Sequence, residues 1–188
     1  YNVYAAADIK RADGTVVYKQ GALVKENFTT GDDGSATLKG LYLGTYRVTE
    51  MKAPTNLICV GESKEVTLSY AGQNVEGDLT FVNDRQKAKV FAGKQDKDTK
   101  KPLAGAVFGL YAGKDIKNQD GQVVVVKDTL IAKATTDEMG SGAFAADLPN
   151  NNSYYVKELQ APANYFRNSD EVYSFDFQYT NDKEATVS

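Results

Sequence analysis

Residues 154–165 of the chain read Tyr-Tyr-Val-Lys-Glu-Leu-Gln-Ala-Pro-Ala-Asn-Tyr, and residues 46–57 read Tyr-Arg-Val-Thr-Glu-Met-Lys-Ala-Pro-Thr-Asn-Leu. Both stretches place a tyrosine, a valine and a glutamate at alternate positions before an Ala-Pro pair. Because side chains two residues apart on a strand point to the same side of a sheet, the pattern predicts two half-buried β-strands. Each apolar stripe ends on a carboxylate, Glu50 or Glu158, and a buried carboxylate needs a partner. The partners of these two glutamates are therefore the first question about function.

The two stretches belong to a longer tandem repeat with a period of about 100 residues. The matched segments are 1–10 with 108–117, 13–17 with 120–124, 46–57 with 154–165, and 79–84 with 177–182. Each copy consists of short apolar runs separated by turns rich in Gly, Asp and Asn, without helical periodicity. The sequence therefore predicts an all-β protein of two tandem immunoglobulin-like β-sandwiches, residues 1–86 and residues 87–188.

Composition argues against several classes of function. The 188 residues include no histidine, the usual general base and the commonest metal ligand. The single cysteine, Cys59, cannot form a disulfide within the chain and is interpreted as a buried small apolar residue. The net charge of -3, with mixed signs, argues against a nucleic-acid surface, and no apolar run is long enough to span a membrane.

Acidic residues also give little support for metal or catalytic sites. The clusters at 31–34 and 96–98 lack the regular oxygen spacing of a calcium loop and are interpreted as turns. No pair of carboxylates has a spacing that supports glycoside cleavage. We therefore predict no metal, no cofactor and no enzymatic turnover.

In the second copy, three predicted strands each end an apolar stripe on a polar residue. The polar residues are Lys94, Glu158 and Asn181, after the stripes at 90–92, 154–156 and 175–179. Polar groups that converge in a core can satisfy one another. A desolvated lysine amine is a nucleophile, a carboxamide is an electrophile, and a protonated carboxyl group can shuttle protons. Loss of ammonia would leave a Lys–Asn isopeptide bond, helped by an effective molarity of roughly 10⁵ M or more.

The sequence resembles the collagen-adhesin B-type (Cna-B) repeat domains of Gram-positive surface adhesins and pilins. The resemblance rests on Lys-Gln-Asp-Lys-Asp-Thr at 94–99, Pro-Leu-Ala-Gly-Ala-Val-Phe-Gly-Leu-Tyr at 102–111, the stretch 154–165, and Tyr-Thr-Asn at 179–181. The stretch 154–165 is similar to the pilin E-box, but has Leu159 where that motif has Thr and Asn164 where it has Gly. In that family a prealbumin-like sandwich forms a spontaneous Lys–Asn isopeptide bond. The resemblance implies that Lys94 and Asn181 are joined here, with Glu158 as the proton shuttle.

The first copy matches this pattern only in part. Glu50 and Asn83 occupy the places of the glutamate and the acceptor asparagine, but the matching lysine would lie about fourteen residues before Tyr1. We therefore expect the first sandwich to lack its N-terminal strand. Its open edge could be completed by a separate N-terminal segment of the protein.

The resemblance implies a structural stalk segment of a bacterial surface adhesin or pilus, located outside the cell and adjoining other domains of the same protein. Its only reaction would be one self-crosslinking event. The alternative is an adhesin module that binds a host matrix protein or a glycan, for which Leu57–Asp78, longer than its counterpart, is the candidate surface. Val17-Tyr-Lys19 is similar to the sortase-linked pilin motif but lacks its proline, so a plain hairpin strand is favoured.

Overall fold

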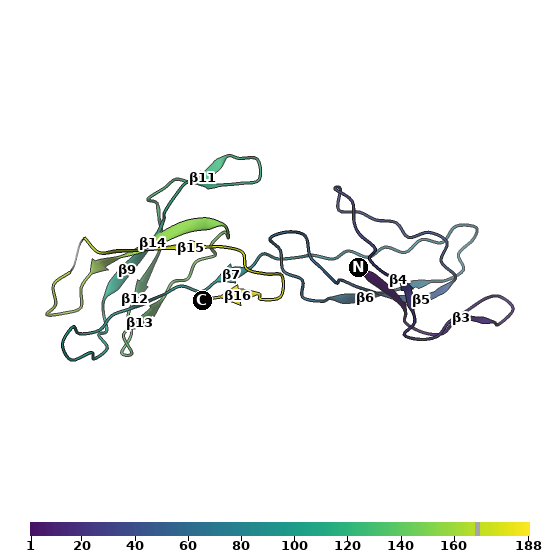
Figure 1. Cartoon of the computed structure of the whole chain (residues 1–188), viewed down its shortest axis with the longest axis horizontal. Helices are drawn as coiled ribbons and strands as arrows, with labels where there is room; N and C mark the ends of the chain where they lie inside the picture. The colour runs from purple at the N-terminus through teal and green to yellow at the C-terminus, as the bar shows by residue number, and fades with distance from the viewer. Residues whose placement is uncertain (168–169) are drawn as a thin grey trace. The chain divides into compact units, whose positions relative to one another are not determined.

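The computed structural model describes residues 1–167 and 170–188, and this part of the chain contains β-strands and no α-helix (Figure 1). Accordingly, it contains no helix that could cross a membrane. The chain divides into two compact units, Tyr1–Asp84 and Arg85–Ser188, called here the first and second domains. The predicted bounds were 1–86 and 87–188. The side chains of Arg85 and Gln86 hydrogen-bond to residues of the second domain.

The first domain is built on an antiparallel sheet of four strands in the order β4-β1-β5-β6. These strands are β4 (Leu23–Lys25), β1 (Asn2–Ala5), β5 (Gly44–Thr49) and β6 (Ser63–Leu68). A separate hairpin pairs β2 (Ile9–Lys10) with β3 (Val16–Tyr18). Its turn contains the predicted Asp-Gly pair, and Gly14 has a φ of 86°, which glycine adopts without steric strain.

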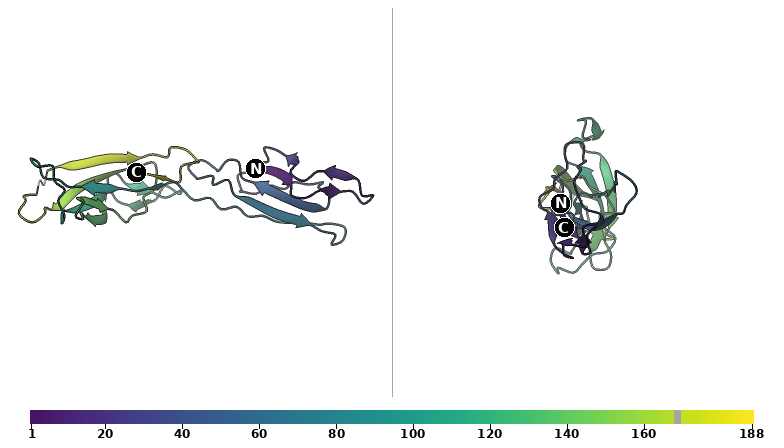
Figure 2. Two further views of the ribbon diagram at one scale, coloured as in Figure 1. Left: turned by 90° about the horizontal axis from the view of Figure 1, so that it is seen from below. Right: turned by 90° about the vertical axis from the view of Figure 1, so that its right-hand side faces the viewer.

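The second domain repeats this sheet with the strand order β12-β9-β14-β15. Figure 2 shows the strands of this domain, coloured teal to yellow-green, from two further sides. These strands are β12 (Leu130–Thr135), β9 (Val107–Ala112), β14 (Asn152–Gln160) and β15 (Val172–Phe177). Three shorter pairs complete the domain. They are β13 (Ser141–Ala143) with β8 (Phe91–Gly93), β16 (Thr186–Val187) with β7 (Lys87–Ala88), and β10 (Ile116–Lys117) with β11 (Val123–Val125).

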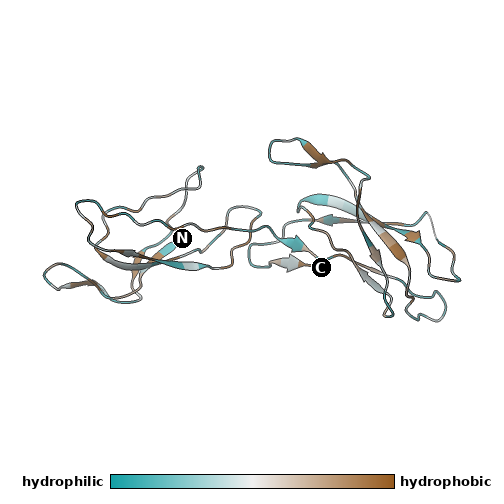
Figure 3. Ribbon diagram, turned by 180° about the vertical axis from the view of Figure 1, so that it is seen from behind, coloured by the Kyte–Doolittle hydropathy of each residue, from teal (hydrophilic) through white to brown (hydrophobic). Residues whose placement is uncertain are grey.

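The β10–β11 hairpin carries an apolar strand that the core does not cover. Figure 3 shows β11 as strongly hydrophobic, and Val124 is 59% exposed. The hairpin is nevertheless anchored as its counterpart in the first domain is, since Ile116 of β10 is buried in the core like Ile9 of β2. Val125 of β11 also packs against the core, so it is the middle of β11 that stays exposed.

The alternation predicted for the two glutamate stretches is confirmed. Tyr46 and Tyr154 are each 1% exposed, and Glu50 and Glu158 are also buried. Each tyrosine hydroxyl donates a hydrogen bond of 2.7 Å to a nearby backbone carbonyl, so these phenols are buried without an unpaired polar group. The same faces of β5 and β14 thus supply both the apolar core and the carboxylate at its end.

Candidate functional site

Glu158 lies near the end of β14, the strand between β9 and β15, where it is opposite Phe108. Its side chain points into the domain and is 6% exposed. There it meets Lys94, which follows β8, and the distance from Lys94 Nζ to Glu158 Oε1 is 2.9 Å. The structure therefore brings together two of the three residues that the sequence predicted for the second domain.

The backbone around Lys94 is fixed on both sides. Lys94 N donates to Gly140 O at 2.7 Å, and Leu103 N donates to Lys94 O at 3.0 Å. Gly140 has a φ of 71°, and a Cβ added there would lie 2.4 Å from Lys94 O, so a larger residue would push β8 away. Ala92 is buried and Phe91 is 56% exposed, as the predicted parity of this strand requires. Lys94, two residues after Ala92, therefore points toward the core.

The Lys94–Glu158 contact is an ion pair between a lysine whose side chain is 24% exposed and a buried carboxylate. Apart from this cation, no described residue donates a well-aligned hydrogen bond to Glu158 Oε1. Desolvation of both charges offsets much of their attraction, so such a pair contributes little net stability. It is chemically informative, however. A proton that moves from Nζ to the carboxylate leaves a neutral amine, the form of lysine that attacks a carbonyl carbon.

A second contact ties the segment after Glu158 to the turn after Lys94. Tyr165 OH donates to Asp96 Oδ2 at 3.0 Å, and Asp96 Oδ1 accepts hydrogen bonds from the backbone and hydroxyl of Thr99. These hydrogen bonds, with that from the Thr99 backbone foremost, lower the pKa of Asp96 to about 2. Asn164, just before Tyr165, has the left-handed conformation predicted for it, with a φ of 69°. The turn thus directs Tyr165 back toward the strand that carries Lys94.

We expect this tie to give the second domain a measurable sensitivity to acid. Because the pKa of Asp96 is lower in the folded state than its ordinary value of 3.8, its contribution is fully present above about pH 4 and is lost as the pH falls toward 2. Urea unfolding between pH 5 and pH 2, values chosen to span this window, should show a shallower loss of stability for Tyr165→Phe and Asp96→Asn than for the wild type. Tyr70→Phe, at an exposed position in the first domain, is the control. Equal pH slopes for all four proteins would contradict the expectation.

Asn181, the predicted acceptor, does not lie with Lys94 and Glu158. β15 ends at Phe177, and Asn181 is exposed in a following turn. Its Oδ1 accepts hydrogen bonds of 2.9 Å from the backbone N–H groups of Lys183 and Glu184. The inward stripe of β15 therefore does not continue to Asn181 as the alternation predicted. Asparagine readily forms such bonds to the backbone just after it, which explains why it ends up in a turn.

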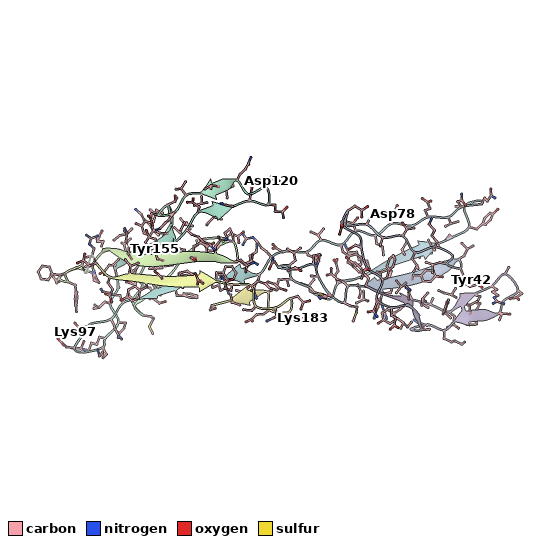
Figure 4. The ribbon with its side chains drawn as sticks, turned by 45° about the horizontal axis from the view of Figure 1, so that its top comes forward. Tyr42, Asp78, Lys97, Asp120, Tyr155 and Lys183 are labelled. Carbon is pink, nitrogen blue, oxygen red and sulfur yellow. The ribbon has the colours of Figure 1, made fainter. Side chains whose placement is uncertain are left out.

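The turn that contains Asn181 is held by a residue that sequence reasoning missed. Gln86 is fully buried, and its Nε2 donates to Thr180 Oγ1 at 2.7 Å and to Glu184 O at 2.8 Å. Gln86 precedes Lys94 by eight residues, which is roughly 25 Å of extended chain. In Figure 4, Lys97, which is three residues after Lys94, and Lys183, which is two residues after Asn181, lie at opposite ends of the second domain. Lys94 and Asn181 are therefore far apart. No apolar pattern marks Gln86, which sits in a charged segment typical of a linker.

The first domain shows the complementary half of the predicted trio. Glu50 is 3% exposed, and Asn83 Nδ2 donates to its Oε2 at 2.8 Å. Asn83 Nδ2 also donates to Ile58 O at 3.1 Å, so the carboxamide is held beside the carboxylate. Tyr1 OH lies 3.5 Å from Glu50 Oε1. Burial, followed by the charge of Glu50, raises the pKa of the Tyr1 phenol. Here glutamate and asparagine meet, whereas in the second domain lysine and glutamate meet.

Two other sequence interpretations can be compared with the structure. Cys59 is buried, as predicted, and its Sγ lies 3.6 Å from Glu50 O. The stretch Leu57–Asp78 is not a free loop, because it contains β6, a strand that pairs with β5 along its whole length. Only its two ends are available as loops for a ligand.

Comparison with known proteins agrees with this architecture. The model of the SpaA prealbumin-like fold domain matches residues 5–83 and again residues 88–188. No curated protein matches the chain.

Among solved structures, the Bacillus anthracis TIE protein is similar, with 25% identity and a TM-score of 0.53. The match covers the whole of this chain and 30% of the TIE protein chain, so the chain spans less than a third of that relative. The shaft pilin SpaA of Lactobacillus rhamnosus GG matches 95% of the chain and 82% of its own length, at 16% identity and a TM-score of 0.36. A streptococcal ancillary pilin matches the whole chain and 55% of its own length, at 20% identity and a TM-score of 0.32.

The repeated strand order, the predicted tandem organisation and the double family match agree with one another. The chain belongs to the family of SpaA prealbumin-like fold domains, and it contains two of them in tandem.

Proposed function

We propose that this chain is a structural stalk segment of a bacterial surface adhesin or pilus, and that its second domain is built for a covalent Lys–Asn tie. The observation that carries the proposal is the 2.9 Å contact between Lys94 Nζ and the buried Glu158 Oε1. A core does not need a buried ion pair for its stability, so a chemical use of the pair is the better explanation. The family and its pilin members support the structural role and a location on the cell surface.

The chemistry needs only a carboxamide next to this pair. Glu158 takes a proton from the Lys94 ammonium group, and the neutral Nζ attacks the side-chain carbonyl carbon of an asparagine. Protonated Glu158 then delivers this proton to the departing nitrogen, takes up the second proton that Nζ loses as the amide forms, and releases it to water. The new bond joins Nζ to Cγ, the Cγ–Nδ2 bond breaks, and ammonia leaves. The reaction occurs once per molecule, because the product is a crosslink in the protein itself.

The acceptor predicted from the sequence is Asn181. To react, Asn181 would have to leave the turn in which Lys183 and Glu184 bind its carboxamide oxygen. In the first domain, Asn83 already lies beside Glu50, and a lysine from a separate N-terminal segment would complete that site. Both asparagines are therefore candidate acceptors: Asn181 has to reach Lys94 and Glu158, and Asn83 needs only a lysine.

A tie between the beginning and the end of a domain resists strand separation, because force cannot pull the ends apart without breaking a covalent bond. Single-molecule stretching of the protein taken from the cell surface tests this role. We expect the second domain to stay unextended at forces that extend the first domain, and Glu158→Gln to allow both to extend. Full extension of the second domain in the wild type would contradict the proposed function.

A further inference from the structure

Lys94 combines a fixed backbone with a flexible side chain. Its N–H and C=O groups are both hydrogen-bonded, whereas its amine lies at the end of a long side chain that is 24% exposed. Within the described part of the chain, this amine is the partner of Glu158 Oε1. A misplacement of about 1 Å can slow a reaction roughly 100-fold, so the position of the amine needs support from its surroundings.

The apolar packing beside this pair is incomplete. Lys94 follows β8 and Glu158 belongs to β14, and these two strands lie in different sheets. A groove of about 340 Å³ is open between β8 and β15, over the side chains of Phe108 and Val156. Open space on one side of a side chain removes the contacts that would hold it there. Packing alone therefore fixes the distance between the two sheets less firmly here than in a closed core.

A second polar contact joins the same two segments of the chain. Tyr165 OH donates to Asp96 Oδ2 at 3.0 Å. Asp96 follows Lys94 by two residues, and Tyr165 follows Glu158 by seven. The ion pair and the phenol–carboxylate bond are thus two connections between one pair of segments. A hydrogen bond to an ionised carboxylate is stronger than one between neutral groups, so the second connection can hold the first in place.

The Asp96 end of this connection is rigid. Asp96 Oδ1 accepts hydrogen bonds from Thr99 N at 2.7 Å, Thr99 Oγ1 at 2.8 Å and Asp98 N at 3.0 Å. The backbone N–H of Asp96 donates to Lys101 O at 2.9 Å. These bonds fix both the turn and the rotation of the carboxylate. The other oxygen, Oδ2, is thereby held in position for the hydroxyl of Tyr165.

The Tyr165 end is held by a tight turn directly after β14. β14 ends at Gln160, and Tyr165 N donates to Pro162 O at 3.1 Å. Asn164 has a φ of 69°, which turns the chain back just before the tyrosine. Few free torsions remain between the end of the strand and the phenol. A displacement of Tyr165 is therefore passed on to the part of β14 that carries Glu158.

We propose that Tyr165 and Asp96 are a positioning pair, which holds the Lys94 amine against Glu158 for the crosslinking step. Neither residue gives or takes a proton in that step. The inference rests on the proposed function for its chemistry, but it concerns only the geometry of the amine. In the first domain the place of Tyr165 is taken by Leu57, which has no hydroxyl group, so the device belongs to the second domain.

The first test observes the ammonium group of Lys94 in chains whose mass shows no crosslink. In chains with ¹⁵N-labelled lysine, the Nζ signal exchanges with water more slowly when a carboxylate holds the ammonium group, and Lys94→Arg identifies the signal. We expect Tyr165→Phe to speed this exchange about fivefold, the factor that one hydrogen bond is worth. Tyr155→Phe is the matched control, because it removes the 3.1 Å bond of another phenol to a carboxylate, that of Asp128. Equal exchange in the wild type and Tyr165→Phe would overturn the inference.

The second test follows the reaction in the full-length protein, in the cells that make it. After a pulse of labelled amino acids, intact-mass spectrometry of the denatured protein gives the fraction that has lost one ammonia at successive times. Tyr165→Phe should slow this loss about fivefold and still reach the final extent of the wild type. Asp96→Ala should also slow it, and the double variant should be no slower than Asp96→Ala alone, since both changes remove one bond.

The two tests separate this inference from the proposed function. A wild-type protein that keeps its full mass would contradict the proposed function, and the exchange of the Lys94 ammonium group would then decide the positioning role alone. If the wild type loses ammonia and Tyr165→Phe loses it at the same rate, the proposed function stands and the positioning role is wrong. Equal slowing by Tyr155→Phe would overturn the inference as well, because the effect would not depend on where the phenol lies.

Discussion

Lys94→Met is expected to destabilise the second domain by about 3 kcal/mol in chains whose mass shows no crosslink. The substitution keeps the length of the side chain but leaves the Glu158 carboxylate buried without its cation, and removing one partner of a buried pair costs several kcal/mol. Lys94→Met combined with Glu158→Leu should recover most of the loss, since an apolar pair of similar volume needs no desolvation. Urea unfolding of the four proteins of this cycle measures the coupling.

The control for this cycle is Lys97→Met, because Lys97 lies in the exposed turn three residues after Lys94. Its stability should stay within about 0.5 kcal/mol of the wild type. If Lys94→Met were equally neutral, the Lys94–Glu158 contact would carry no energetic weight, and its assignment as the centre of the site would be wrong.

Leu110→Ala is the second change with a large expected effect. Leu110 is fully buried in β9, the strand that lies between β12 and β14. Truncation removes apolar contacts and leaves a cavity, which costs about 3 kcal/mol at such a site. Leu130→Ala on the neighbouring strand is the control, because Leu130 is 40% exposed. Its loss should be less than about 1 kcal/mol, and equal losses at both positions would contradict the assignment of the core.

Much of the fold could be predicted from the sequence because its signals are local. Alternation at 46–50 and 154–158 correctly indicated which side chains are buried, including both glutamates. The Asp-Gly pairs mark hairpin turns, and Asn56 and Asn164 have the left-handed backbone expected after the Ala-Pro pairs. Tandem duplication strengthened each of these predictions, since the two copies had to agree.

The acceptor could not be predicted in the same way, because alternation indicates the face of a residue only while the strand continues. The pattern through Phe175 and Phe177 was extended to Asn181, but the strand ends before that residue. The segment after β15 is held by Gln86, whose hydrogen bonds to Thr180 and Glu184 are long-range contacts without a sequence pattern. The position of Lys94, by contrast, followed from the parity of a strand that remains regular up to that residue.

The central claim is that Lys94 becomes the donor of a crosslink, and peptide mapping of the protein taken from the cells that make it tests this most directly. The account predicts that trypsin does not cleave after Lys94. It also predicts that the peptide containing Lys94 is recovered as a branched species, joined to an asparagine-containing peptide and lighter by one ammonia than the sum of the two. Recovery of the Lys94 peptide only in its linear, cleaved form would contradict the account.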